Sequence, residues 1–266
     1  MAAPEQVKAR TDSPSDPCDR PLLSVVIPTY NEESTIGQVL QRVASAAPGV
    51  SKEIIVSNDG SSDGTARVLR DEAAAGRIVL EDSPVNRGKG AALRAGLRRA
   101  KGEVILIQDA DLEMNPDHYP ALIAPILSGD AEVVYGSRFA GRLWPGGSVL
   151  GFLANKTLVA LTNLLYGSRL TDVETCYKVF RAEALSKINL ACNGFDFEVE
   201  VSGKLLRAGF DIHEVPVSYQ PRSHAQGKKV RWPDAVQAAW VLARCRFAPM
   251  ESVLASQPEA EGPWAR

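Results

Sequence analysis

Short apolar runs rich in β-branched residues alternate with segments of helical periodicity, and this alternation constrains the fold more than any other feature of the sequence. Strands are predicted at Leu22–Ile27, Glu53–Val56, Arg77–Leu80 and Glu103–Ile107. Helices are predicted between them, at 34–47, 63–75 and 90–100. Repeats of strand, helix and strand build parallel sheets with helices packed on their faces. We therefore predict an α/β protein with a mostly parallel, nucleotide-binding sheet flanked by helices.

The second half of the chain is less regular. Strands are predicted there at Glu132–Tyr135, Cys176–Arg181 and Ile212–Tyr219, and helices at 149–166, 196–208 and 232–247. A chain of 266 residues is long enough for one large domain. We place a single domain at 22–247, with its two halves at 22–113 and 114–247. Disordered tails are predicted at 1–21 and 248–266, where Pro, Ser, Ala and acidic residues dominate.

Composition and charge exclude several classes of protein. The net charge of −2 disfavours a protein that neutralises many nucleic-acid phosphates, so we expect no nucleic-acid partner. The four cysteines form no CxxC pair of the kind that binds zinc or carries redox chemistry, which fits a reducing compartment. The first twenty residues lack the apolar core of a signal peptide. We therefore expect a cytoplasmic protein.

Three carboxylates follow the buried strand that ends at Ile107. Asp109, Asp111 and Glu113 stand where the carboxyl end of a parallel strand meets a ligand. Their oxygens suit a hard divalent cation, Mg²⁺ or Mn²⁺, which can bridge the two phosphates of a nucleotide. The alternative is that one Asp caps the next helix while the other is solvated.

Two further clusters indicate nucleotide binding. Asp59 comes shortly after the predicted strand Glu53–Val56, where its oxygens could accept hydrogen bonds from a nucleobase, although an Asp-Gly turn also explains it. The run Asn86-Arg-Gly-Lys-Gly90, which contains Lys89, opens a helix with glycines and cations, as suits phosphate binding. Because it matches neither the P-loop nor the dinucleotide fingerprint, those two classes lose support.

Taken together, four ordered motifs resemble glycosyltransferase family 2. They are Ser24-Val-Val-Ile-Pro28-Thr-Tyr30-Asn31-Glu32, Ser57-Asn-Asp59-Gly-Ser-Ser-Asp-Gly-Thr65, Asn86-Arg-Gly-Lys-Gly90 and Asp109-Ala-Asp111. Within the family, the chain is similar to dolichyl- and polyprenyl-phosphate mannose synthases from Leu22 to Phe247. The resemblance implies a GT-A fold with a smaller acceptor-side region at 114–247. It also implies transfer of a sugar from a nucleotide donor to a lipid phosphate.

The resemblance assigns roles to single residues. Pro28, Tyr30 and Glu32 match the motif that cradles the nucleoside, Asp59 the acid that binds the base, Asp109 and Ala110 donor contacts, and Asp111 a metal ligand. Glu113 stands where these synthases commonly have Gln, a change that keeps an oxygen ligand. The chain departs from the family pattern at Ser57-Asn58, so the identity of the base stays open.

Basic residues of the second half are predicted to hold phosphates. Arg138 matches a phosphate- or donor-binding arginine of the synthases, and Arg222 and Lys228 match another such pair. A phosphomonoester is largely ionised at neutral pH and attacks without a general base, but it needs cations. We therefore predict Asp109, Asp111 and Arg138 as the catalytic set. The alternative for 222 and 228 is a solvated basic loop.

These residues predict an inverting, metal-dependent glycosyltransferase that moves a hexose, with mannose from GDP-mannose as the first choice, to a polyprenyl or dolichyl phosphate. One alternative is a UDP-glucose-dependent polyprenyl-phosphate glucosyltransferase. Another is a family 2 enzyme that acts on a glycan hydroxyl, with Asp196 or Glu198 as its base. A non-catalytic nucleotide-sugar-binding protein is disfavoured by the intact acidic motif.

A lipid acceptor implies contact with a membrane. No apolar run in the sequence reaches the roughly 20 residues that span a bilayer, so we expect peripheral contact at the cytoplasmic face. Two segments combine Trp, Arg and apolar residues, as suits an anionic lipid surface, namely 138–166 and 232–247. The alternatives are that both helices pack on the sheet, or that one binds a separate membrane subunit.

Overall fold

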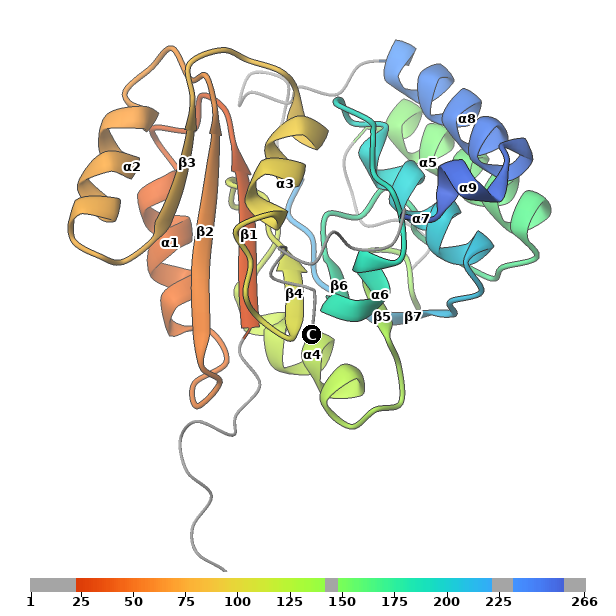
Figure 1. The fold of residues 1–266 in the computed structure, drawn as a ribbon, viewed down its shortest axis with the longest axis horizontal. Helices are drawn as coiled ribbons and strands as arrows, with labels where there is room; N and C mark the ends of the chain where they lie inside the picture. The colour runs from red at the N-terminus through yellow and green to blue at the C-terminus, as the bar shows by residue number, and fades with distance from the viewer. Residues whose placement is uncertain (1–22, 142–147, 222–231, 256–266) are drawn as a thin grey trace, which may run out of the picture.

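The computed structural model describes residues 23–141, 148–221 and 232–255 (Figure 1). Their strands form one seven-stranded sheet in the order β3-β2-β1-β4-β6-β5-β7. The strands are β1 (Leu23–Thr29), β2 (Lys52–Asp59), β3 (Val79–Ser83), β4 (Val104–Ile107), β5 (Val133–Ser137), β6 (Lys178–Arg181) and β7 (Ile212–Pro216). Neighbours pair in parallel except at β6, which runs antiparallel to both β4 and β5. The predicted mostly parallel α/β sheet is confirmed.

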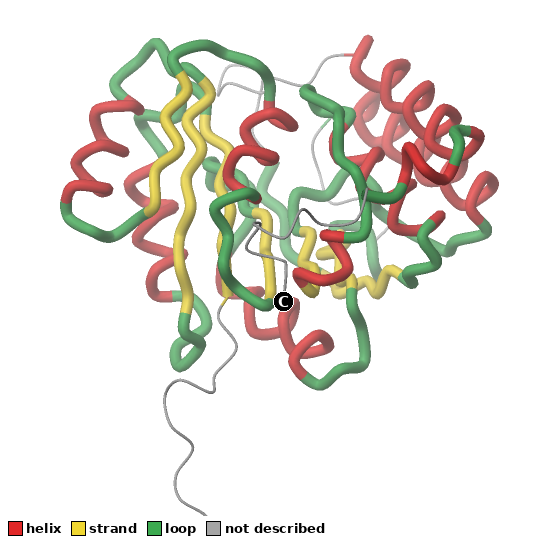
Figure 2. Tube along the Cα trace, viewed as in Figure 1, coloured by secondary structure: helices red, strands yellow, loops and turns green. Residues whose placement is uncertain are grey.

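Helices cover the sheet and fill one end of the molecule (Figure 2). They are α1 (Ile36–Ser45), α2 (Thr65–Ala74), α3 (Lys89–Leu97), α4 (Tyr119–Leu127), α5 (Val149–Tyr166), α6 (Ala182–Ser186), α7 (Phe197–Arg207), α8 (Trp232–Phe247) and α9 (Met250–Val253), with a 3₁₀ turn at Pro116–His118. Sequence reasoning missed α4, because Pro120 and Pro125 weaken its helical signal; Pro120 stands in the first turn, where its missing N–H costs little.

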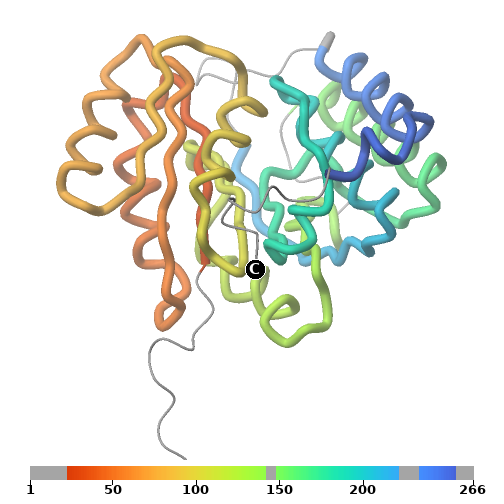
Figure 3. Tube along the Cα trace, viewed as in Figure 1, coloured from red at the N-terminus to blue at the C-terminus, as the bar shows by residue number. Residues whose placement is uncertain are grey.

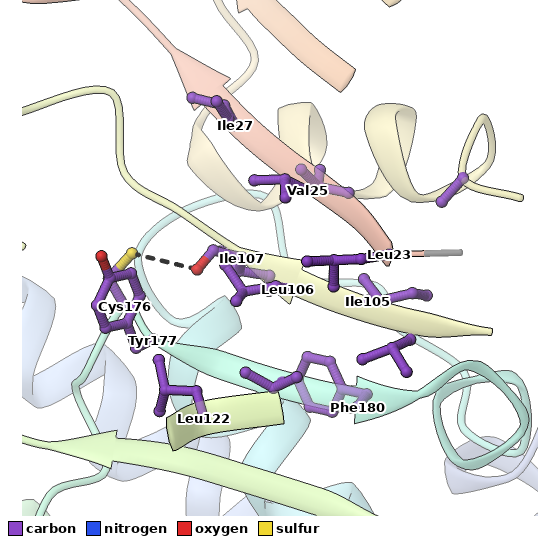
Figure 4. Packing of buried hydrophobic residues seen from close by; sticks show 14 of the residues in the cluster. Leu23, Val25, Ile27, Ile105, Leu106, Ile107, Leu122, Cys176, Tyr177 and Phe180 are labelled. Carbon is purple, nitrogen blue, oxygen red and sulfur yellow. Dashed lines mark hydrogen bonds between the residues drawn. The ribbon is translucent and has the colours of Figure 1, made fainter. Parts of the chain in front are cut away.

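The two halves of the chain meet in the middle of the sheet, where β4 pairs with β6 (Figure 3). The main core lies along this sheet and contains the apolar runs of β1 and β4 together with Phe180 of β6 and Tyr177, which precedes that strand (Figure 4). Such runs are typical of strands buried on both faces. A second, smaller core joins α5, α7 and α8 through residues such as Leu158, Val199 and Leu242. These three helices belong to the second half of the chain, 114–247, whose place on the acceptor side stays a prediction.

Two sequence expectations need correction. The C-terminal tail was expected to begin at 248, but α9 follows and Val253 is fully buried. A β-bridge joins Ile188 to Leu254, so ordered chain continues through 255. Secondly, no segment was expected to be long enough to cross a membrane, whereas α5 has 18 residues and a mean hydropathy of 1.3, which meets that test by length and composition. Residues 1–22 and 256–266 lie outside the described structure.

Candidate active site

The sheet brings the sequence motifs to one edge. β1, β2, β4 and β5 all point the same way, so the residues that follow them share an edge of the sheet. Because β6 is reversed, the residues that precede it lie at this edge as well. The edge therefore collects the segments after Thr29, Asp59, Ile107 and Ser137, together with the segment before Lys178.

The loop after β1 joins three of the motifs. Asn31 has a positive φ of 49°, a conformation that Asn tolerates better than most residues. Glu32 is buried, and its backbone N–H donates to Thr65 Oγ1 at 2.9 Å. The Thr35 hydroxyl lies 2.9 Å from Glu32 Oε2 and 3.0 Å from the carbonyl oxygen of Ala110. The first, second and fourth motifs are thus tied to one another.

Tyr30 and Pro28 differ in burial. The Tyr30 side chain is half-buried, so it is not sealed in the core as ordinary packing would require. Pro28 is buried near the end of β1 and lies opposite Ser57 of β2. The predicted nucleoside contacts at these two positions stay predictions.

Asp59 has a structural role that the sequence did not reveal. Its Oδ1 accepts from the backbone N–H of Arg87 at 2.7 Å, and its Oδ2 accepts from that of Gly88 at 2.8 Å. Gly88 has a φ of 101°, and a Cβ there would meet the Asn193 carbonyl oxygen. Asp59 therefore holds the glycine-rich loop in shape, in addition to its predicted role in binding the base.

Lys89 links the two halves of the site. Its Nζ lies 2.8 Å from Asp109 Oδ1 and 2.9 Å from Glu198 Oε1 of α7. Glu198 Oε2 in turn lies 2.5 Å from the fully buried Lys178 Nζ. Burial by itself lowers the pKa of Lys89, but the carboxylates of Asp109 and Glu198 outweigh it and raise that pKa well above its ordinary value. Lys89, which the sequence predicted to bind phosphate, therefore lies between two carboxylates in this structure.

The three predicted metal ligands, Asp109, Asp111 and Glu113, contact different partners in the structure. Asp111 Oδ1 accepts from the Glu113 backbone N–H at 3.0 Å, and Glu113 Oε2 accepts from the Tyr219 hydroxyl at 3.0 Å. Within 23–141, 148–221 and 232–255, no three His, Cys, Asp or Glu side chains gather as a metal site. The three predicted ligands thus do not converge, since Asp109 faces Lys89. Asp111 and Glu113 still offer the hard oxygens that suit Mg²⁺ or Mn²⁺.

Arg138 is held by a carboxylate at the end of β5. Its Nε and Nη2 donate to Asp172 Oδ2 and Oδ1 at 2.7 and 2.8 Å, a bidentate pair, and its guanidinium lies 5.1 Å from the centre of the Tyr219 ring. Burial lowers the pKa of Arg138, but the Asp172 carboxylate outweighs it and raises that pKa above its ordinary value. The guanidinium therefore stays charged and fixed in orientation.

Sequence reasoning missed several of these partners. The sequence indicated Glu198 only as a base for a hydroxyl acceptor, whereas in the structure it pairs with both Lys89 and Lys178. Asp196 accepts from Gly194 N at 3.1 Å and from Gln237 Nε2 at 2.8 Å, so its oxygens are engaged in packing α7 against α8. Arg222 and Lys228 lie outside the described residues.

Comparison with known proteins identifies the family. The model of glycosyl transferase family 2 matches residues 24–188. The polyprenol monophosphomannose synthase of Mycolicibacterium smegmatis is 32% identical over 235 residues, which cover 81% of this chain and 85% of that protein. The undecaprenyl-phosphate mannosyltransferase of Micrococcus luteus is 30% identical over 215 residues, or 76% and 85% of the two chains.

A hexosyltransferase of low-salt glycan biosynthesis from Haloferax volcanii is 31% identical over 206 residues, and the match spans 48% of that longer protein. Among solved structures, glucosyl-3-phosphoglycerate synthase from Mycobacterium tuberculosis with Mn²⁺, UDP and phosphoglyceric acid superposes with a TM-score of 0.67. It is 23% identical and covers 91% of this chain and 85% of its own, a likeness that shows the GT-A-like fold. This chain therefore belongs to glycosyltransferase family 2 and is a hexosyltransferase.

Proposed function

We propose that this enzyme transfers a hexose from a nucleotide sugar to a polyprenyl phosphate, with inversion at the anomeric carbon. The observation that carries the proposal is the state of Asp196 and Glu198, the bases expected for a hydroxyl acceptor. Asp196 holds Gly194 and Gln237, and Glu198 lies between Lys89 and Lys178. A phosphate acceptor needs no base, because it already carries the nucleophilic oxygen in ionised form.

The names of two relatives support the same acceptor class, since one is a polyprenol monophosphomannose synthase and the other an undecaprenyl-phosphate mannosyltransferase. GDP-mannose is accordingly the first donor to test. UDP-glucose is the second, because the structural neighbour glucosyl-3-phosphoglycerate synthase has been crystallised with Mn²⁺ and UDP-glucose. A glycan hydroxyl as acceptor is the remaining alternative.

The reaction follows from the charges at the sheet edge. A phosphate oxygen of the acceptor attacks the anomeric carbon, the bond from that carbon to the donor diphosphate breaks, and the nucleoside diphosphate leaves with the electron pair. Arg138 is the fixed cation for the phosphates on the acceptor side. Lys89 holds Asp109 in place beside the donor. Asp111 and Glu113, with diphosphate oxygens, would hold Mg²⁺ or Mn²⁺, which would offset the charge on the leaving group.

We further infer that α5 and α8 rest on the cytoplasmic face of a membrane. The exposed stripe of α5 contains Val149, Leu153 and Leu164, the last 81% exposed, and only 22% of this helix is buried. On α8, Trp240 and Phe247 are exposed with Arg244 between them. Aromatic and basic residues together suit an anionic lipid surface. Because the opposite face of α5 packs on α7 and α8, lying on the bilayer fits better than crossing it.

The test is a transfer assay with undecaprenyl phosphate and a panel of nucleotide sugars, followed by mass spectrometry of the lipid product. We expect a hexosyl phosphoryl lipid from GDP-mannose or UDP-glucose. Transfer to a soluble glycan, with no lipid product from any donor in the panel, would overturn the proposed acceptor. Transfer from a donor outside these two would revise the donor alone.

A further inference from the structure

A second group of charged side chains lies beside the donor carboxylates. β6 runs antiparallel to β4 and β5, so the residues just before it share the edge where those strands end. Asp172 and Glu174 come from this segment, and Arg138 follows β5. The fully buried Lys178, at the start of β6, donates from Nζ to the carbonyl oxygens of Val173 and Thr175. The backbone on both sides of Glu174 is therefore anchored.

Among the described residues of this group, three carboxylates pair with cations, whereas the carboxyl groups of Glu174 and Glu214 form no ion pair. The pairs are Arg138 with Asp172, Lys178 with Glu198, and Lys89 with Asp109. Glu214 accepts hydrogen bonds from Thr171 and from the backbone N–H of Asp172. Glu174 differs from it in having an oxygen without a partner. Its Oε1 is buried and has no hydrogen-bond partner among the described residues. The residue as a whole is half-buried and lies at the edge of the sheet where β5 ends, just before Arg138.

The surroundings of Glu174 favour its neutral form. Burial is the largest influence, followed by the carboxylate of Glu198 on α7, and both raise its pKa. Lys178 of β6 and Arg138 after β5 lower the pKa, whereas Asp172 raises it. The balance brings the pKa of Glu174 to about 7. A large share of these carboxyl groups therefore carries a proton at neutral pH, and a second anion nearby would increase that share.

We propose that Glu174 binds the acceptor phosphate as a neutral carboxylic acid, donating a hydrogen bond to a phosphate oxygen and taking up one proton from solvent when the phosphate binds. This inference rests on the proposed lipid-phosphate acceptor. An ionised carboxylate only accepts hydrogen bonds and repels a phosphate, whereas the protonated form supplies a donor. A sugar hydroxyl would make no such demand, since it can donate to an ionised carboxylate. A protonated Glu174, whose Oε1 has no hydrogen-bond partner within the described protein, therefore suits an anionic ligand.

The experiment is calorimetric titration of the full-length protein with a short-chain isoprenyl phosphate, in two buffers of different ionisation enthalpy, from about pH 6 to about pH 8.5. For the natural protein we expect uptake of about one proton on the alkaline side, with affinity falling there by up to about tenfold per pH unit. In Glu174→Gln the neutral carboxamide keeps a hydrogen-bond donor. Proton uptake should therefore disappear, together with the part of the fall in affinity at alkaline pH that Glu174 causes. Glu183→Gln, which alters an exposed carboxyl on α6, should behave as the natural protein does.

The outcomes separate this inference from the function on which it rests. Equal proton uptake and equal pH dependence in the natural protein and Glu174→Gln, with lipid transfer intact, would overturn the inference alone. Absence of both isoprenyl-phosphate binding and lipid transfer in the natural protein would overturn the proposed acceptor as well. Transfer that instead rises with pH and is lost in Glu174→Gln would make Glu174 the base of a hydroxyl acceptor.

The pH dependence of stability, measured without ligand, tests Glu174 independently of binding and reveals any folding defect in Glu174→Gln. Because the pKa of Glu174 is raised in the folded state, the native protein holds this proton more tightly than the unfolded chain does. Its contribution to stability is therefore present at acid pH and is lost as pH rises towards about 7. The stability of Glu174→Gln, measured by thermal unfolding, should not show this loss as pH rises. If the loss were the same as in the natural protein, Glu174 would not hold the proton on which the inference depends.

Discussion

Lys89 connects Asp109, after β4, to Glu198 of α7 through one ammonium group. Its ion pairs with Asp109 and Glu198 are largely shielded from water, since its side chain is 15% exposed. Lys89→Met removes the cation and leaves Asp109 with one charged partner fewer. We expect a loss of about 3 kcal/mol in the free energy of unfolding, measured by urea denaturation. Lys101→Met, at an exposed lysine, should change it by less than about 0.5 kcal/mol. Equal losses of stability in the two variants would show that the ion pairs of Lys89 with Asp109 and Glu198 do not stabilise the fold.

Asp111 is the carboxylate on which the proposed metal site depends most. It is 7% exposed and shares its backbone segment with Glu113. Asp111→Asn keeps the shape but removes the charge, so we expect transfer to fall by about a hundredfold or more. Removing divalent ions with EDTA should abolish transfer, and Mg²⁺ or Mn²⁺ should restore it. Full activity after both treatments would rule out the metal.

At the scale of elements, α5 and α8 present apolar surface that the described structure leaves uncovered. Trp240 is 66% exposed, and burying a side chain of this kind in lipid is worth about 1.5–3 kcal/mol. Trp240→Ala should therefore weaken co-sedimentation with anionic liposomes by about tenfold, whereas Leu127→Ala, at an exposed residue of α4, should have little effect. Binding should also weaken with salt. Failure to bind liposomes of any composition would favour a separate membrane subunit.

At the scale of the whole molecule, the chain brings donor motifs from 23–113 and the Arg138–Asp172 pair from the second half to one sheet edge. An acceptor phosphate that attacks the donor directly inverts the anomeric carbon. From an α-linked donor we therefore expect a β-linked lipid product, assigned by NMR of the purified glycolipid. An α-linked product would require a double displacement or another mechanism, and would contradict the single step.

Local periodicity by itself determined most of the elements. The predicted helices at 149–166 and 232–247 match α5 and α8, because a helix leaves its period of apolar residues in the sequence. The motifs at strand ends were equally visible. Tertiary structure alone decided the reversal of β6 and the partners of the charged groups. Lys89 meets Glu198, and Tyr219 meets Glu113, across more than a hundred residues. Such pairings depend on how distant segments pack and leave no local pattern, so only the fold could reveal that Glu174 Oε1 is buried without a hydrogen-bond partner among the described residues.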